Sequence, residues 1–374
     1  MFYMLLALLV CPYVVFPFVM ALLVPFERKR RVPYEPHVAV LIPARNEVAC
    51  IAQKIRNTLA SDYPVEKTRI VVASDGSIDG TDEEVAIFTD RGVQLIRLED
   101  GLGKAEAVNR MAEAVDAEIL VFTDADVLID ASALRLMAQH FADDKVGAVC
   151  SRRVVSVRTG AASAWAERIH RYYESLIKRG EGVLGRVIGA DGALYAVRRD
   201  CFMRVPSNVP DDFVAVLRVL KSGMKVTYEA AAVASEEPSS TRQGEALARR
   251  RRTVARAMRG VWQERGLLNP IRFPLCSLLL FSHKVCRWFG GVILGGLLIS
   301  NMLLLSDPFF RWCLVVQVSC YSLACLGYLA QGRRVGRVLV LFRYFALSNL
   351  GAALGVFDAL SGRDWATWRP QRRD

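Results

Sequence analysis

Three long runs without a charged residue constrain this chain more than any other feature of its sequence. They cover residues 1–26, 288–306 and 312–332. At 1.5 Å per helical residue, about 20 residues are enough to cross a hydrocarbon core of about 30 Å. Hydrophobic residues make up 53% of the 374 residues, a high share for a soluble protein. The sequence therefore predicts an integral membrane protein with transmembrane segments at these three places.

The charges around these runs predict an orientation. The first run lacks the basic start of a signal peptide and is too long for one, so we interpret it as an uncleaved anchor. The stretch "ERKRR" follows it at residues 27–31. The positive-inside rule then places the following region in the cytoplasm. Residues 288–306 and 312–332 form a hairpin that returns to the basic "GRRVGR", which the same rule also places inside. We expect a protein of the plasma (inner) membrane.

Two further apolar segments are predicted to lie along the membrane surface. Residues 336–360 contain Arg343 and have basic flanks on both sides, so a full span would leave one flank outside. An interfacial or re-entrant segment is favoured over a spanning helix, and residues 361–374 form a basic cytoplasmic tail. An interfacial helix is predicted at residues 267–284.

The region of residues 34–265 alternates between two patterns. Short apolar runs at 38–43, 69–74, 93–98 and 118–123 are separated by stretches with helical spacing. This order predicts an α/β domain whose parallel sheet is covered on both faces. In such sheets ligands bind beyond the carboxyl ends of the strands. Polar residues follow all four runs, so we expect a binding crevice at that edge.

Asp124 and Asp126 follow the fourth run directly. Residues two apart in an extended chain point to the same side, and two adjacent carboxylates repel one another unless they share a cation. Mg²⁺ or Mn²⁺ prefers oxygen ligands and would be completed by the oxygens of a diphosphate. A D-x-D sequence also occurs by chance in solvated loops, but the position after a buried strand favours a metal site.

The second and third runs end in "SDGS" and "GLGK". Asp75 either opens an ordinary Asp-Gly turn or accepts a hydrogen bond from the ring N–H of a nucleobase. The residues around Lys104 match neither of two phosphate-binding motifs. Glu106 stands where a dinucleotide fingerprint has its third small residue, and Leu98 stands where a Walker A pattern has its first glycine. Lys104 is either a solvated lysine or a phosphate ligand.

Residues 249–259 contain six arginines and no acid. On a helix Arg249, Arg252, Arg256 and Arg259 form one stripe, and Val254, Met258, Val261 and Trp262 form another. The arginines either neutralise a diphosphate or contact anionic lipid headgroups. A nucleic-acid partner is disfavoured, because the run adjoins a membrane hairpin and lacks interleaved aromatic residues.

An ordered set of motifs resembles a known family. The motifs are "VAVLIPARNE", "VASDGSIDGT", "GLGKAEAVN", "FTDAD", "ADGALYAVRR", "PDDFVAVLRVLKSG" and "SHKVCRWF". Over about residues 36–300 the chain resembles the membrane-bound family 2 glycosyltransferases, in the cellulose-synthase-like branch that includes hyaluronan and chitin synthases. A "WATWR" at 365–369 is also similar.

The resemblance implies a GT-A fold, a nucleoside-diphosphate sugar donor that is usually a UDP-sugar, and transfer with inversion. Asp124 and Asp126 match the metal-binding pair, and Lys104 the lysine after the third strand. Arg252 falls near the arginine of the "QxxRW" motif of processive members, whose tryptophan is replaced here by Thr253; this argues against long-chain processivity. The remaining matches concern the nucleotide (Pro43, Ala44, Asn46, Glu47 and Asp75) and the acceptor (Gly189, Asp191 and Gly192).

Inverting transfer also needs a carboxylate that removes the proton of the attacking hydroxyl. Asp212 matches the base aspartate of the family, and Asp211 replaces the usual glutamate before it. The alternative is that one of the two caps the helix that follows.

These features predict an inverting, metal-dependent hexosyl- or N-acetylhexosaminyltransferase that acts on a lipid-linked or growing polysaccharide acceptor at the inner face of the membrane. Membrane lipids are the other expected partners. The alternatives are a non-catalytic nucleotide-sugar-binding scaffold, which would be expected to lose Asp126 or Asp212, and a dehydrogenase. The latter needs a glycine-rich loop where "PARNE" stands.

Overall fold

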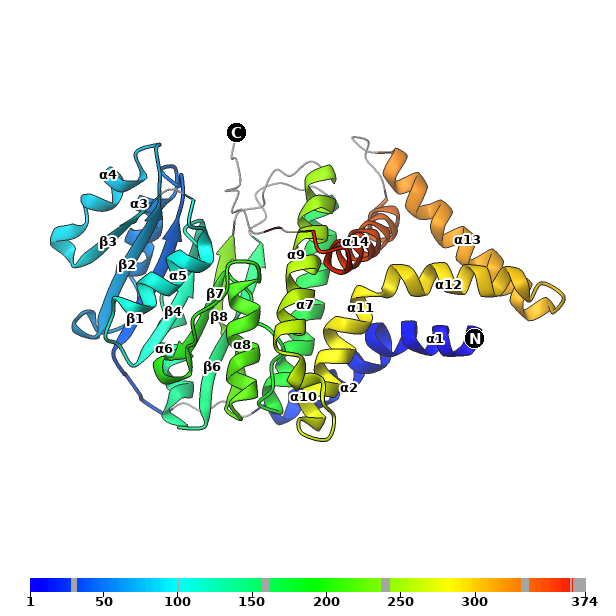
Figure 1. Ribbon diagram of the computed structural model, residues 1–374, viewed down its shortest axis with the longest axis horizontal. Coiled ribbons are helices and arrows are strands. Elements are labelled where there is room, and N and C mark those ends of the chain that lie inside the picture. The colour runs from blue at the N-terminus through cyan, green and yellow to red at the C-terminus, as the bar shows by residue number, and fades with distance from the viewer. Residues whose placement is uncertain are drawn as a thin grey trace.

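The computed structural model describes residues 1–27, 32–99, 101–155, 162–236, 243–330, 336–363 and 365. Most of the predicted basic stretches at 27–31 and 332–337, the "WATWR" motif and the 361–374 tail lie outside the described residues. The described part consists of one α/β domain and a group of apolar helices that extend from one side of it (Figure 1).

An eight-stranded sheet forms the centre of the α/β domain, with strand order β3-β2-β1-β4-β7-β6-β8-β5. The strands are β1 (Val38–Ala44), β2 (Thr68–Asp75), β3 (Val93–Leu98), β4 (Ile119–Thr123), β5 (Val127–Ile129), β6 (Val146–Val155), β7 (Leu194–Arg198) and β8 (Lys225–Glu236).

The first four strands alone form a continuous parallel half-sheet. β1 pairs in parallel with β2 and β4, and β2 pairs in parallel with β3. The predicted runs match these strands to within one residue. The other half is mixed: β7 runs antiparallel to β4 and β6, β5 runs antiparallel to β8, and β6 runs parallel to β8. The sheet is therefore mostly parallel, as predicted, with antiparallel pairs in its second half.

Helices cover both faces of the sheet because its central strands are apolar on both sides. In β1, Ala39 and Leu41 join a core with α5, α8 and α9, whereas Val40 and Ile42 join a core with α3 and α6. The helices of this domain are α3 (Ile51–Leu59), α4 (Thr81–Ala86), α5 (Lys104–Glu113), α6 (Ala133–Ala138), α7 (Ala162–Val183), α8 (Asp211–Lys221) and α9 (Gln243–Gln263).

The remaining helices are apolar. They are α1 (Phe2–Val10), α2 (Phe16–Leu23), α10 (Pro274–Leu280), α11 (Cys286–Trp288), α12 (Gly290–Leu303), α13 (Pro308–Leu329) and α14 (Arg337–Leu360). Within the part of the chain that the structure describes, three stretches are long and apolar enough to cross a membrane, namely Phe2–Phe26, Pro308–Leu329 and Arg337–Leu360. A fourth is possible only if Pro274–Trp288 and Gly290–Leu303, which bend by 65° between them, count as one span.

Two close helix contacts join the apolar helices to the α/β domain. Gly180 of α7 lies so near α2 that a Cβ atom there would be 2.4 Å from the Met20 carbonyl oxygen. Gly355 of α14 approaches α9 in the same way, with 2.5 Å from a Cβ atom to the Arg251 carbonyl oxygen. Arg251 also forms a bidentate pair with the buried Asp358, at 2.5 and 2.6 Å. The two groups of helices therefore share packed interfaces.

Candidate active site

The loops that follow β1 and β2 are hydrogen-bonded to one another at the carboxyl edge of the sheet. The Asn46 N–H donates to Ser77 Oγ at 3.1 Å, and Asn46 Oδ1 accepts from the Ile78 N–H at 3.0 Å. The Glu47 N–H donates to Thr81 Oγ1 at 2.9 Å. Asn46 has a φ of 54°, a left-handed conformation that asparagine tolerates better than most residues. Pro43 and Ala44 end β1 just before this loop.

Asp75 ends β2 beneath this pair of loops and is fully buried. Its two carboxylate oxygens accept hydrogen bonds from the Leu102 and Gly103 N–H groups, both at 3.0 Å. Arg45 adds a salt bridge at 3.2 Å. Sequence analysis missed Arg45, although it lies inside the "PARNE" motif. The interpretation of Asp75 as an ordinary turn residue is incomplete, because its side chain connects three loops.

Lys104, the first residue of α5, lies at the centre of the candidate site. Its Nζ is 2.7 Å from Asp124 Oδ1 and 3.6 Å from Asp211 Oδ2. Gly103 precedes it with a φ of 90°, a value that favours glycine and turns the chain into the helix. Lys104 is therefore an ion-paired residue and not a solvated one.

A glycine keeps the middle of this cluster open. A Cβ atom at Gly192 would lie 3.4 Å from Asp212 Oδ2, 3.5 Å from Lys104 Nζ and 3.6 Å from Asp124 Oδ2. The three charged groups thus surround one point that carries no side chain of its own. The structure brings together residues that stand far apart in the sequence, at positions 104, 124, 192 and 212.

The charges at this point are not balanced. Burial acts to lower the pKa of Lys104, but Asp124, Asp211 and Asp212 outweigh it and raise that pKa, so the ammonium stays charged. Burial raises the pKa of Asp124, as does Asp126, against the opposing effect of Lys104. Burial and the neighbouring Asp211 raise the pKa of Asp212 to about 6. The negative charge of these carboxylates is therefore only partly neutralised by Lys104.

A divalent cation fits this deficit. Asp124 and Asp126 lie on the turn between β4 and β5 and offer carboxylate oxygens, which Mg²⁺ and Mn²⁺ prefer. Throughout the described ranges, no group of three or more His, Cys, Asp or Glu side chains is placed to hold an ion. Asp124 and Asp126 would supply two ligands, and the oxygens of a bound diphosphate would have to supply the others. Such an ion would supply neutralisation of the charge that develops on a departing diphosphate.

Asp211 and Asp212 are the first two residues of α8, and the N-cap is Pro210. Pro210 thus takes the N-cap position, while Asp211 and Asp212 open the first turn of the helix. Asp211 is buried and accepts a hydrogen bond from the Tyr195 hydroxyl at 3.4 Å. Asp212 Oδ1 accepts from the Phe213 N–H at 2.8 Å, which leaves Oδ2 directed at the open point beside Gly192. Of the two, Asp212 is the one with a carboxylate oxygen beside this open point, where proton removal would take place.

The predicted acceptor segment borders the same space. Gly189 has a φ of 94°, and a Cβ atom there would clash with Phe213 at 2.7 Å. Asp191 pairs with Lys178 at 2.7 Å and with Arg171 at 3.6 Å, both from α7. Burial acts to raise the pKa of Asp191, but these two cations outweigh it and hold that pKa well below its usual range. Asp191 is thus a fixed anion and poorly suited to accept a proton.

Of the two predicted arginines of α9, Arg256 contacts the segment that leads to the site. Arg256 Nη2 donates to the carbonyl oxygens of Ser207 and Val209, at 3.2 and 2.6 Å, in the segment that leads to Asp211. Arg252 is half-buried on the same helix. Val254 and Val261 are buried in the core as the second stripe predicts, but Trp262 is 70% exposed. The contacts of Arg256 support the loop before α8.

Lys54, on α3, is a member of the site that sequence analysis missed. It is fully buried, and its Nζ donates to Thr123 Oγ1 at 2.8 Å and to the Val127 carbonyl at 2.7 Å. Burial lowers the pKa of Lys54 to about 7, against the opposing effect of Asp124 and Asp126. Nothing in the spacing of "VACIAQKIRNTLA" marks this lysine, because its partners lie about 70 residues away.

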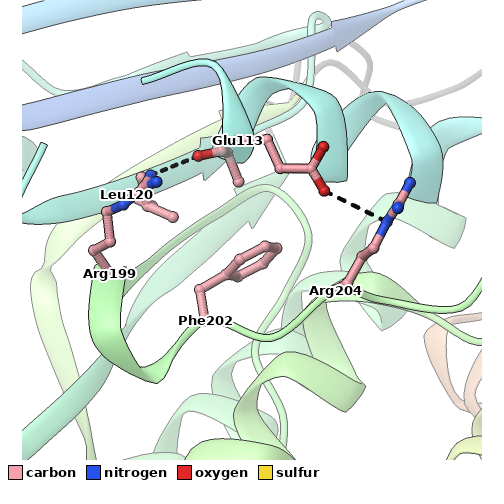
Figure 2. A pocket seen from close by; sticks show the side chains of 6 residues that line it. Glu113, Leu120, Arg199, Phe202 and Arg204 are labelled. Atoms are coloured by element: carbon pink, nitrogen blue, oxygen red, sulfur yellow. Dashed lines mark hydrogen bonds and ion pairs between the residues drawn. The ribbon is translucent and has the colours of Figure 1, made fainter. Parts of the chain in front are cut away.

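Two surface pockets lie beside α5, and each is lined in part by the segment of residues 199–207. One, of about 190 Å³, is lined by Glu113, Arg199, Phe202 and Arg204 among others (Figure 2). The other, of about 470 Å³, is lined by residues of α5 and of the 204–207 segment, with Leu102. Neither is lined by Asp124, Asp126 or Asp212. These pockets are therefore distinct from the charged cluster.

Comparison with known structures defines the class of fold. A mannosyltransferase from Pyrobaculum calidifontis, PcManGT, solved in complex with GDP-Man and Mn²⁺, superposes with a TM-score of 0.70. The match covers 96% of this chain and 98% of that chain at 19% sequence identity. The α/β domain therefore has the GT-A fold, as the resemblance predicts.

Sequence comparison adds a family match for part of this domain. Residues 39–202 match the family described as Glycosyl transferase family 2. The chain is 24% identical over 198 residues to poly-beta-1,6-N-acetyl-D-glucosamine synthase of Staphylococcus aureus, with 51% of this chain and 48% of that protein covered. It is also 24% identical over 218 residues to the probable glycosyltransferase YdaM of Bacillus subtilis, with 55% and 52% covered. The chain thus spans about half the length of the curated relatives that it matches.

Proposed function

We propose that this protein transfers a sugar, with inversion, from a nucleoside-diphosphate sugar to a lipid-linked or growing saccharide acceptor. The observation that carries the proposal is the convergence of Lys104, Asp124 and Asp212 on the open point beside Gly192. A donor diphosphate would be held there by the cation at Asp124 and Asp126 and by the Lys104 ammonium. The family 2 match of residues 39–202 supports this assignment.

Within this proposal Asp212 is the general base. Its raised pKa and its carboxylate oxygen beside the open point suit proton removal from an acceptor hydroxyl near neutral pH. Asp75 and the loop of residues 43–47 would hold the nucleotide, and the segment with Gly189 and Asp191 would face the acceptor. Arg252 and Arg256 would contribute positive charge near the diphosphate, in addition to the structural contacts of Arg256.

We further propose a UDP-sugar donor and a membrane-surface acceptor. The relative from S. aureus is named for a polymer of N-acetylglucosamine, which favours an N-acetylhexosaminyl donor. The solved neighbour holds GDP-Man with Mn²⁺, so GDP-sugars belong in the same test. The predicted orientation puts the domain on the cytoplasmic side of the inner membrane. The interfacial position of α14 is our proposal from its basic flanks, although this helix is also long and apolar enough to cross a membrane.

Nucleotide release by the full-length, detergent-purified protein tests the function. UDP-, GDP- and dTDP-sugars are supplied separately with a lipid extract, in Mn²⁺, Mg²⁺ or EDTA. We expect one donor class to be consumed only with metal, and Asp126→Ala and Asp212→Asn to lower turnover by about 10²- to 10⁴-fold. Asp130→Ala is the matched control, because this exposed aspartate lies just beyond β5. Metal-independent turnover, or full activity of Asp212→Asn, would contradict the proposed mechanism.

A further inference from the structure

The buried ammonium of Lys54 holds both ends of the turn that carries the two metal-binding aspartates. Thr123 and Val127, its two hydrogen-bond partners, are the residues immediately before and after Asp124–Asp126. Inside the turn, the Val127 N–H reaches the Asp124 carbonyl at 3.3 Å. The side chain of one lysine thus fixes the separation between the end of β4 and the start of β5.

The same contacts reach the acceptor side of the site. The Thr123 hydroxyl, which accepts from Lys54, donates to the Ala193 carbonyl at 2.8 Å. Ala193 follows Gly192, the residue that leaves the centre of the cluster open. A hydrogen-bonded chain of Lys54, Thr123 and Ala193 therefore connects α3, the metal turn and the acceptor segment.

A second residue of α3 extends this attachment. Asn57 lies three positions after Lys54 and bonds Ile129 in both directions, donating to its carbonyl at 2.9 Å and accepting from its N–H at 2.8 Å. Residues 123, 127 and 129 are therefore all fixed to one face of α3. β5 has only three residues, so few ladder bonds of its own hold the turn.

A lysine is unexpected at this position, because its neighbours Ile51 and Ile55 on the same helix are core residues. Burial of an ammonium without compensation is strongly unfavourable. Here the compensation comes from one hydroxyl, one carbonyl and the nearby charges of Asp124 and Asp126. A methionine of similar length would fill the same volume but could not hold the turn.

We propose that Lys54 is a positioning residue that orders the Asp124–Asp126 turn for binding of the divalent cation. This inference rests on the proposed function, since it assigns the metal to that turn. It predicts the direction in which metal affinity changes when Lys54 is replaced. A positive charge close to the cation acts against metal binding, so loss of that charge alone would strengthen binding, whereas loss of the ordered turn weakens it.

The experiment measures Mn²⁺ binding by full-length protein in detergent, from the electron paramagnetic resonance signal of free Mn²⁺ at a fixed UDP or GDP concentration. We expect Lys54→Met to weaken Mn²⁺ binding about tenfold or more and to raise the Mn²⁺ concentration for half-maximal turnover in parallel. Thr58→Val is the matched control. Thr58 is a buried residue of the same helix whose hydroxyl bonds only the Lys54 carbonyl, at 2.9 Å, and it should leave Mn²⁺ binding unchanged.

A second pair of variants keeps the test valid if Lys54→Met does not fold. Thr123→Val removes the hydroxyl with little change of shape and should weaken Mn²⁺ binding several-fold, whereas Thr123→Ser retains the hydroxyl and should restore it. Unchanged or tighter Mn²⁺ binding by Lys54→Met or Thr123→Val overturns the positioning role. If the wild-type protein itself neither binds Mn²⁺ nor consumes a donor, the proposed function fails instead.

Discussion

Asp211 and Asp212 show how neighbouring residues of the same type acquire different chemistry. The carboxylate of Asp211 is buried against Lys104 and Tyr195, whereas one oxygen of Asp212 faces the open point beside Gly192. Their positions at the start of one helix point the two side chains in different directions. The proposed division into an ion-paired residue and a base follows from these surroundings.

The raised pKa of Asp212 gives a pH prediction. Because burial and Asp211 raise it to about 6, the carboxylate becomes protonated, and inactive as a base, as pH falls through that value. We expect kcat/KM to rise with pH to a plateau above about pH 7. A profile that stays flat from pH 5 to pH 8 would exclude Asp212 as the base.

The same shift predicts a change in stability. An acid whose pKa is higher in the folded than in the unfolded state destabilises the fold once it is ionised in both. Asp212→Asn should therefore melt at a higher temperature than the wild type at pH 7.5, and the difference should shrink as pH falls from about 6 towards 4. Thermal melts at several pH values measure this directly.

Residue spacing predicted part of the candidate site and missed another part for a physical reason. Asp75 ends a strand, Lys104 begins a helix, and Asp124 and Asp126 lie on the turn after a strand, so their common edge follows from the parallel order of the strands. Lys54 lies in the middle of a helix, and only the tertiary fold reveals its partners. The local sequence around Lys54 carries no information about contacts with residues about 70 positions away.

At the scale of elements, a clasp between α5 and the segment of residues 199–209 holds the two sides of the site together. Asn109 of α5 bonds both the carbonyl and the N–H of Val205, at 2.9 and 2.8 Å. Arg204 pairs with Glu106 at 2.6 Å. α5 begins at Lys104 and the 199–209 segment leads to Asp211, so the clasp sets the distance between them.

Removal of the central contact should therefore affect both stability and turnover. Asn109→Ala leaves two buried backbone groups of Val205 without partners, which we expect to lower the free energy of unfolding by about 2 kcal/mol. We also expect a lower kcat, with a smaller change in KM for the donor.

Glu113→Ala provides the control. Figure 2 shows Glu113 facing Arg204, but the pair is 3.6 Å apart and half-exposed, and such surface pairs contribute about 0–1 kcal/mol. Melting curves and steady-state kinetics of both variants suffice. Equal effects of the two substitutions would show that the Asn109 contacts do not set the site.

The elements themselves were largely predictable, and their pairing was only partly so. Alternation of apolar runs and helical spacing located β1 to β4, because β1, β4 and most of β2 are buried and the edge strand β3 is still apolar at four of its six positions. The antiparallel position of β7 between β4 and β6 depends on a partner about 75 residues earlier in the chain. A helix after Asp211 and Asp212 was predicted, but the N-cap position belongs to Pro210, which ends an extended segment and carries no side-chain donor or acceptor.

For the whole molecule, the contact between α2 and α7 makes part of the apolar N-terminal stretch a component of the core of the α/β domain. Phe16 and Met20 of α2 belong to the same buried cluster as β1, α5 and α8. Gly180 is required there because any side chain would meet the Met20 backbone.

Gly180→Ala should therefore separate α2 from α7 and lower the free energy of unfolding by about 1–3 kcal/mol. A thiol-reactive dye can follow unfolding in detergent, since Cys50, Cys150, Cys276 and Cys286 are buried. Gly295→Ala is the control, because a Cβ atom at this α12 glycine would meet nothing within 4 Å. Similar melting temperatures for Gly180→Ala and the wild type would contradict the shared core.

That shared core has a geometric consequence for the acceptor. α2 packs against α7, and α14 packs against α9. With the apolar helices in the bilayer, as we propose, these contacts would hold the active site at one height above it, and the reacting hydroxyl would have to be presented at that height. The length of an acceptor's headgroup, measured from its lipid tail, would then decide whether the acceptor hydroxyl reaches Asp212.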